Sequence, residues 1–135
     1  PIPHRLQLIK NPNGIIIIDD AFNSNPVGAK MALDVLGNFK GGKKILVTPG
    51  LVELGEIEYE ENKKLGERAA AICDYVIVVG KTQAEPIIAG LEEKKFSSNK
   101  IKNVQSLSTA SQHLQTILKA GDIILFENDL PDNYL

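Results

Sequence analysis

The stretch richest in chemistry-bearing side chains is residues 19–25, which reads Asp-Asp-Ala-Phe-Asn-Ser-Asn and directly follows an apolar run. A carboxylate such as that of Asp20 can accept two hydrogen bonds from a ribose diol. Amides such as those of Asn23 and Asn25 can hold a phosphate or a carbonyl beside a helix N-terminus. The same residue types are also common helix caps. These residues alone therefore leave two interpretations open, a ligand site or a capping loop.

Two further loops carry polar side chains after apolar runs. Residues 48–56 read Thr-Pro-Gly-Leu-Val-Glu-Leu-Gly-Glu, where proline and glycine predict a sharp turn. Glu53 and Glu56 there could face an amine or a basic partner, or they could be surface acids on a rigid loop. Lys81 follows a glycine and could reach a substrate carboxylate or phosphate. A single loop lysine is more often simply solvated, so the residues alone do not decide its role.

The elements that must position these side chains are short β-branched runs separated by helical patterns. Runs that are apolar at successive positions are typical of strands covered on both faces of a parallel sheet. Repetition of strand and helix predicts a doubly wound α/β sheet with helices on both faces. The predicted strands are residues 15–18, 45–47, 75–79 and 123–126, with a weaker one at 101–104, and the predicted helices are 27–36, 58–73, 82–91 and 108–118, the last capped by Ser108.

An edge strand is expected at the start of the chain, where Leu6 and Leu8 alternate with polar neighbours and residues 11–14 form a turn. The prediction is a Rossmann-like three-layer α/β domain, with a mostly parallel sheet of about six strands and an antiparallel N-terminal edge strand. Residues 1–135 are expected to be a single domain. Ligands in such sheets bind beyond the carboxyl ends of the strands, so the three polar loops and residues 127–133 after the last strand should share one edge.

The composition narrows the class of protein. The 135 residues are 43% hydrophobic and 24% charged, which is typical of a folded domain, and the formal charge of -2 gives no positive field for nucleic acid. One cysteine, Cys73, cannot form an internal disulfide, which favours a reducing cytoplasm. The apolar runs are too short to cross a bilayer. A first residue of Pro1 rather than Met suggests a piece of a longer chain.

Several catalytic motifs are missing from the sequence. Neither GxGxxG nor GxxxxGK[ST] occurs, so the chain is not expected to hold a nucleotide on its own. His4 and His113 lie far apart without metal-ligand spacing, which argues against zinc. Cys73 has no histidine partner to activate it and is expected to fill the core. We predict no catalytic residue and no metal ligand in this chain.

The motifs together resemble a known family. Residues 3–6, Pro-His-Arg-Leu, followed by Asp-Asp-Ala-Phe-Asn-Ser-Asn-Pro at 19–26, are similar to the start of the C-terminal domain of the Mur ligases. These are ATP-dependent, amide-bond-forming enzymes of peptidoglycan assembly. The loop at 48–56, followed by Asn62, Leu65 and Gly66, resembles the branch that adds D-alanyl-D-alanine. The resemblance extends over nearly the whole chain.

The resemblance implies a role for the domain and for particular residues. It implies that ATP phosphorylates a carboxylate of a UDP-MurNAc-peptide and that the amine of a dipeptide then attacks the acyl phosphate. ATP and Mg²⁺ would be bound mainly by a central ATPase domain, which is a partner in the same chain together with an N-terminal UDP-substrate domain. The implied nucleotide-contacting residues are Arg5, Asp20 and Asn23, with Asp19 as the alternative to Asp20. The implied substrate-binding residues are Asn25, Thr48, Glu53 and Lys81.

Further expectations follow from the same resemblance. The enzyme would be cytoplasmic, with no membrane or nucleic-acid partner, and this domain alone would be inactive. One departure stands out, because the branch usually continues its last strand into Lys-Gly-Ser-Arg, whereas residues 127–131 read Glu-Asn-Asp-Leu-Pro. Acidic residues there would disfavour an anion, which leaves open a paralogue with a different acceptor. A stand-alone nucleotide or small-molecule module and a protein-docking domain also stay open.

Overall fold

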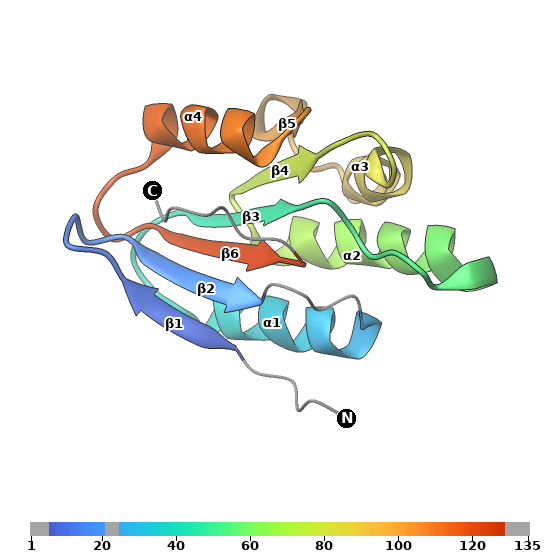
Figure 1. Ribbon diagram of the computed structural model, residues 1–135, viewed down its shortest axis with the longest axis horizontal. Coiled ribbons are helices and arrows are strands. Elements are labelled where there is room, and N and C mark those ends of the chain that lie inside the picture. The colour runs from blue at the N-terminus through green and yellow to red at the C-terminus, as the bar shows by residue number, and fades with distance from the viewer. Residues whose placement is uncertain (1–5, 21–24, 129–135) are drawn as a thin grey trace.

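The computed structural model describes residues 6–20 and 25–128. Its six-stranded sheet has the order β1-β2-β6-β3-β4-β5 (Figure 1). β1 pairs with β2 in antiparallel fashion and all other neighbouring strands are parallel, which confirms the predicted sheet. The strands are β1 (Gln7–Lys10), β2 (Ile16–Asp20), β3 (Lys44–Thr48), β4 (Tyr75–Val79), β5 (Ile101–Val104) and β6 (Ile123–Glu127). The helices are α1 (Pro26–Asn38), α2 (Glu58–Ile72), α3 (Ala84–Glu93) and α4 (Leu107–Ile117), with short 3₁₀ turns at Gly55–Ile57 and Ser98–Lys100.

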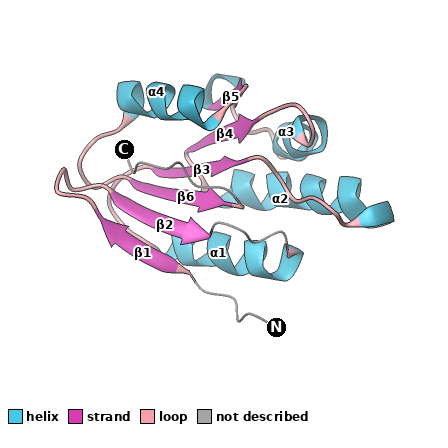
Figure 2. Ribbon diagram, viewed as in Figure 1, coloured by secondary structure: helices cyan, strands magenta, loops and turns pink. Residues whose placement is uncertain are grey.

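Helices cover both faces of the sheet, as predicted (Figure 2). One core lies between the sheet and α1, α2 and α3, and includes Ile18, Leu46 and Leu125. The other lies under α4 and includes Ile17 and Phe126. Successive strand residues point to opposite faces, so the parity of a residue tells which core its side chain joins. Every residue of β6 is buried, as expected for a strand in the middle of a parallel sheet.

The helix starts show where capping residues are used. Asn25 caps α1, and its side-chain oxygen accepts from the N–H groups of Val27 at 2.8 Å and Gly28 at 3.4 Å. The prediction that Ser108 caps the last helix was wrong, because α4 begins at Leu107 and Ser106 is its cap. The extended backbone of Ser106 lets its hydroxyl accept from the N–H of Thr109 at 3.1 Å.

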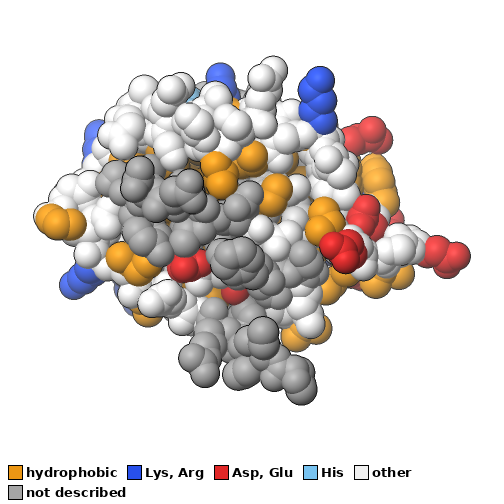
Figure 3. Space-filling view, viewed as in Figure 1, with side chains coloured by type: hydrophobic (Ala, Val, Ile, Leu, Met, Phe, Trp, Pro, Cys, Tyr) orange, Lys and Arg blue, Asp and Glu red, His pale blue; other side chains and the backbone are white. Residues whose placement is uncertain are grey.

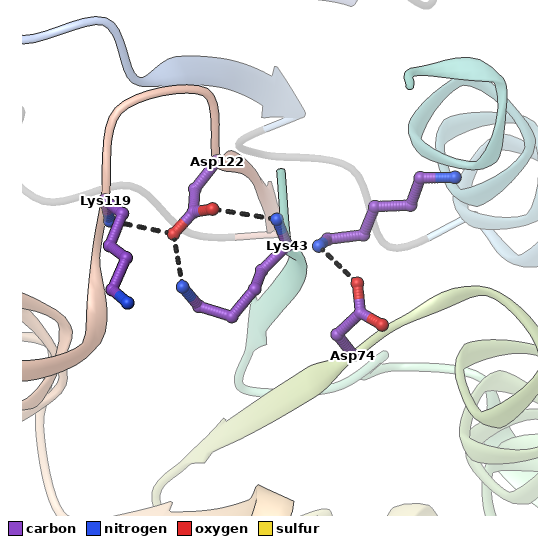
Figure 4. Close-up of polar contacts among 5 residues, drawn as sticks. Lys43, Asp74, Lys119 and Asp122 are labelled. Carbon is purple, nitrogen blue, oxygen red and sulfur yellow. Dashed lines mark hydrogen bonds and ion pairs between the residues drawn. The ribbon is translucent and has the colours of Figure 1, made fainter. Parts of the chain in front are cut away.

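A buried carboxylate fastens the amino ends of two strands together (Figure 4). The Asp122 carboxylate, just before β6, accepts from the backbone N–H groups of Lys43 at 2.8 Å and Lys119 at 2.9 Å, and pairs with the Lys43 ammonium at 2.7 Å. Burial alone would raise the pKa of Asp122, but these hydrogen bonds and the Lys43 charge outweigh it and lower the pKa. Nearby, Asp74 accepts from the N–H of Lys44 at 2.9 Å. This clamp lies at the edge opposite the predicted ligand side.

Cys73 and His113 both pack against other side chains of the domain. Cys73 is buried in the core under α1–α3, and burial raises the pKa of its thiol. The His113 Nε2 atom lies 2.7 Å from the Tyr75 hydroxyl, and burial lowers the pKa of His113. His4 lies outside the described residues. Across residues 6–20 and 25–128, no cluster of three or more histidine, cysteine and acidic side chains could hold a metal ion. No helix in this described part is long and apolar enough to cross a membrane.

Candidate functional site

Five of the seven residues implied by the resemblance lie in the described structure, and all five follow or end strands on one side of the sheet. Asp20 ends β2 and Thr48 ends β3. Asn25 precedes α1, Glu53 lies in the loop after β3, and Lys81 lies in the loop after β4. Arg5 and Asn23 lie outside the described residues. The carboxyl edge therefore gathers loops that are distant in sequence, as the parallel topology requires.

Asp20, Glu127 and Thr48 form a row across this edge. Asp20 is the register partner of Glu127, and Val47 is the partner of Phe126, so the next residue, Thr48, lies beside Glu127. By strand parity all three side chains lie on the face covered by α1, α2 and α3. The prediction placed Asp20, Thr48 and Glu127 at this edge, but it gave no strand order, and the order β2-β6-β3 is what sets Glu127 between the other two.

The row is closed to solvent. Asp20 is 1% exposed and Glu127 and Thr48 are 0% exposed. Burial, together with a hydrogen bond to Asp20 and the charge of Asp20, raises the pKa of Glu127 far above its ordinary value. The Asp20 carboxylate is therefore not exposed at the surface of this structure.

Asn128 links the three strands of the row. Its backbone N–H donates to the carbonyl oxygen of Asp20 at 3.0 Å, and its side-chain amide donates to the carbonyl oxygen of Gly50 at 2.8 Å. Asn128 has a φ of 68°, a left-handed conformation that asparagine tolerates better than most residues. The end of β2 and the loop after β3 are thus fastened to each other across β6.

The loop after β3 turns sharply at Gly50. The Thr48 hydroxyl accepts from the N–H of Gly50 at 2.9 Å, so it stabilises the turn. Gly50 has a φ of 95°, and a Cβ there would lie 2.5 Å from the Cβ of Gln83 and 2.9 Å from the Oδ1 atom of Asn62. Only glycine fits this position, both because of its backbone and because of its neighbours.

A buried amide network holds the same loop, and sequence reasoning did not identify it. Asn62 on α2 accepts from the N–H of Leu51 at 2.8 Å and donates to the carbonyl oxygen of Leu51 at 2.9 Å. It also donates to the Gln83 side chain at 3.1 Å, and Gln83 donates to the Glu58 carboxylate at 2.8 Å. The N–H of Leu54 also donates to Glu58 at 3.3 Å. The sequence shows Asn62 and Gln83 only as amides that follow different strands. Their hydrogen bond depends on the packing of α2 against α3.

An open pocket of about 340 Å³ lies where the loops after β3 and β4 meet, and Glu58, Tyr59, Lys81 and Gln83 help to line it. The hydrogen bond from the Leu54 N–H, followed by that from Gln83, lowers the pKa of Glu58, so this carboxylate is charged at neutral pH. Lys81 is exposed and supplies the opposite charge. Glu58 and Glu85 thus give the pocket two acidic side chains, and Lys81 gives it one cation. Acidic and apolar side chains gather at the end of the molecule where α2 begins (Figure 1 and Figure 3).

Two of the implied substrate-binding residues, Asn25 and Glu53, lie in short segments whose local structure is defined. Asn25 uses its side-chain oxygen to cap α1, so the capping interpretation describes this residue. Glu53 is exposed and has a φ of 63° in the loop after β3. The backbone of Glu53 also contributes to lowering the pKa of Glu58, which places Glu53 next to the pocket.

The fold and site define an α/β domain of Rossmann-like type, whose ligand edge is formed by loops after parallel strands. Residues 4–127 match the sequence model of a protein family described as "Mur ligase, glutamate ligase domain". The chain belongs to this family, and it is homologous to the C-terminal domain of ligases of the MurF type.

Individual relatives agree with the family. The UDP-N-acetylmuramoyl-tripeptide–D-alanyl-D-alanine ligase of Bacillus subtilis is 33% identical over 91% of this chain and 27% of its own length. The UDP-N-acetylmuramoylalanine–D-glutamate ligase of Hydrogenovibrio crunogenus is 30% identical over 93% of this chain and 25% of its own length. A solved structure of the MurF ligase from Thermotoga maritima in complex with ADP superposes with a TM-score of 0.76. It is 30% identical and covers 96% of this chain and 28% of that chain. This chain therefore spans about a quarter of the length of these relatives.

Proposed function

We propose that this chain is the C-terminal domain of an ATP-dependent ligase that joins D-Ala-D-Ala, or a related amine, to a UDP-MurNAc-peptide in the cytoplasm. The observation that carries this proposal is the carboxyl edge, where the loops after β3 and β4 form a pocket with charges of both signs. Its support from the comparisons is the similarity to a D-alanyl-D-alanine ligase and to a MurF ligase in complex with ADP.

The described residues do not form a nucleotide site by themselves. They contain no phosphate loop and no cluster of acidic or histidine side chains suited to a metal ion, and the Asp20 carboxyl is buried beside Glu127. We therefore infer that ATP and Mg²⁺ are held mainly by a central domain of a longer chain, and that an N-terminal domain holds the UDP-linked substrate. ATP would supply the activated acyl phosphate. Contacts of Arg5, Asp20 and Asn23 with the nucleotide rest on the motif alone.

The residues of this chain would bind and orient the acceptor. Lys81 would attract the acceptor carboxylate and Glu58 its ammonium group, because the two side chains line the same pocket. Gln83 and Asn62 would keep Glu58 in place through their hydrogen bonds. Orienting the amine and excluding water both favour amide formation over hydrolysis of an acyl phosphate. Because the relatives include a D-alanyl-D-alanine ligase and a D-glutamate ligase, the family does not by itself fix the acceptor.

The test uses the full-length protein that contains this chain. Phosphate release would be measured with UDP-MurNAc-tripeptide and D-Ala-D-Ala as substrates. Lys81→Ala should raise the KM for the dipeptide about tenfold, as for loss of one charged contact, and leave the KM for ATP unchanged. Lys30→Ala, at an exposed position on α1, is the control. No phosphate release with this or another amino-acid acceptor would contradict the proposed reaction, and unchanged dipeptide kinetics in Lys81→Ala would remove Lys81 from the site.

A further inference from the structure

Glu127 is a buried carboxyl group without a donor. It ends the central strand β6 and is 0% exposed. Neither of its carboxyl oxygens receives a hydrogen bond from a conventional donor in the part of the chain that the structure describes. An ionised carboxylate in such a place would lose its hydration with no replacement, which is among the most unfavourable arrangements in a protein interior.

The groups packed around Glu127 do not compensate a negative charge on its carboxyl group. On β2 its register partner is Asp20, which is also buried, and Asp19 lies on the opposite face of the sheet. On β3 its neighbour is the uncharged Thr48. The buried residues of α1, which packs against β6, are all uncharged: Gly28, Ala29, Ala32, Leu33 and Leu36. In the described parts of β2, β3 and α1, no buried cationic side chain lies beside the Glu127 carboxyl group.

A hydrogen bond between two carboxyl groups needs a proton on one of them, because two carboxylates are both acceptors. We propose that Glu127 keeps its proton at neutral pH and donates it to Asp20, so that the pair is a proton-binding site at the carboxyl edge of the sheet. The proton removes the negative charge that an ionised Glu127 would add to this buried position. Loss of this proton at high pH would add one negative charge to the carboxyl edge.

Burial and the neighbouring Asp20 raise the pKa of Glu127, in agreement with the proposal. The linkage has a definite sign. In the unfolded chain Glu127 ionises near its ordinary pKa, so folding takes up a proton above that pH, and stability falls as the pH rises. The contribution of one proton changes the unfolding equilibrium constant by at most about tenfold per pH unit. This inference is independent of the proposed ligase activity.

The test compares the 135-residue chain with Glu127→Gln, which is neutral at every pH and can donate to Asp20. Urea unfolding would be followed between about pH 5 and pH 8, the range in which the proton linkage acts. The unfolding equilibrium constant of the wild type, divided by that of Glu127→Gln, should rise up to about tenfold per pH unit. Glu92→Gln, at an exposed position of α3, should behave like the wild type. A ratio that does not change with pH would overturn the proposal.

A second measurement does not depend on the folding of a variant. Infrared spectroscopy of the wild type with ¹³C-labelled glutamate should show a protonated carboxyl band at neutral pH, and absence of the band would overturn the proposal. The spectrum would be repeated with added Mg²⁺. Loss of the band at constant pH together with a higher melting temperature would mean that a metal ion occupies the pair instead, and this would also contradict the assignment. A band that persists with Mg²⁺ supports it.

Discussion

Gly66 on α2 lies against the backbone of α3, and Gly90 on α3 lies against the backbone of α2, where the two helices cross. A Cβ atom at Gly66 would lie 2.1 Å from the carbonyl oxygen of Ile87, and one at Gly90 would lie 2.1 Å from the carbonyl oxygen of Lys63. Both contacts are with backbone atoms, which cannot rotate away. The close approach of the helices brings Asn62 within hydrogen-bond distance of Gln83, so this pair of glycines also shapes the pocket.

Replacing either glycine of this crossing should therefore destabilise the domain. Gly66→Ala should reduce the free energy of unfolding by about 3 kcal/mol, although alanine favours a helix by about 1 kcal/mol over glycine. The measurement is urea unfolding. Gly37→Ala on α1 is the matched control, because its Cβ would make an ordinary contact of 3.5 Å with Ile72. Equal stability of the two variants would show that the helices do not pack as closely as described.

The Asp122 clamp predicts a specific response to acid. Asp122→Asn should lower the free energy of unfolding by about 3 kcal/mol at neutral pH, because Lys43 loses its buried partner. Since the folded pKa is lowered, this stabilisation is present above the ordinary value of 3.8 and disappears as the pH falls through the folded pKa. The variant and the wild type should thus converge in acid. Asp34→Asn, at an exposed position on α1, should have little effect, and a constant difference at all pH values would contradict the assignment.

The amide network predicts that the side-chain nitrogen of Asn62 contributes to the stability of the domain. In Asn62→Asp the side-chain nitrogen, which donates to Leu51, Glu58 and Gln83, becomes an acceptor at a residue that is 0% exposed. The free energy of unfolding should fall by about 3 kcal/mol, since buried acceptors then face one another. Asn99→Asp is the control, because Asn99 is exposed and uses its oxygen as an acceptor. Thermal unfolding of both variants decides the matter, and equal melting temperatures would argue against the network.

The turn at Gly50 can be tested in the same way. Gly50→Ala should lower the free energy of unfolding by about 3 kcal/mol, because it combines an unfavourable backbone conformation with contacts shorter than 3 Å. Gly55 also has a positive φ, 63°, but a Cβ there would meet no atom within 4 Å, so Gly55→Ala should show only the backbone cost, about 1 kcal/mol. The difference between the two variants isolates the contact with Asn62 and Gln83. A larger effect at Gly55 would contradict this interpretation.

The sequence by itself determined the layers of this protein and the loops worth studying. Apolar runs such as residues 75–79 are typical of buried strands, and their alternation with amphipathic segments favours a parallel sheet with helices on both faces. That topology places Asp20, Thr48 and Lys81 at one edge. Local signals were less secure, as the shift of the α4 cap from Ser108 to Ser106 shows, because neighbouring serines are chemically equivalent and only the backbone conformation selects one.

Only the tertiary structure decided which side chains meet. Asp20 and Glu127 are at opposite ends of the chain, and they become neighbours because β6 inserts between β2 and β3. The contact between Asn62 and Gln83 likewise depends on how closely α2 and α3 approach. Patterns of hydrophobicity predict which residues are buried, because burial depends on the residue type and on the spacing of apolar residues along the chain. Pairing is a property of two distant segments, and it is set by strand order and helix packing that no local pattern encodes.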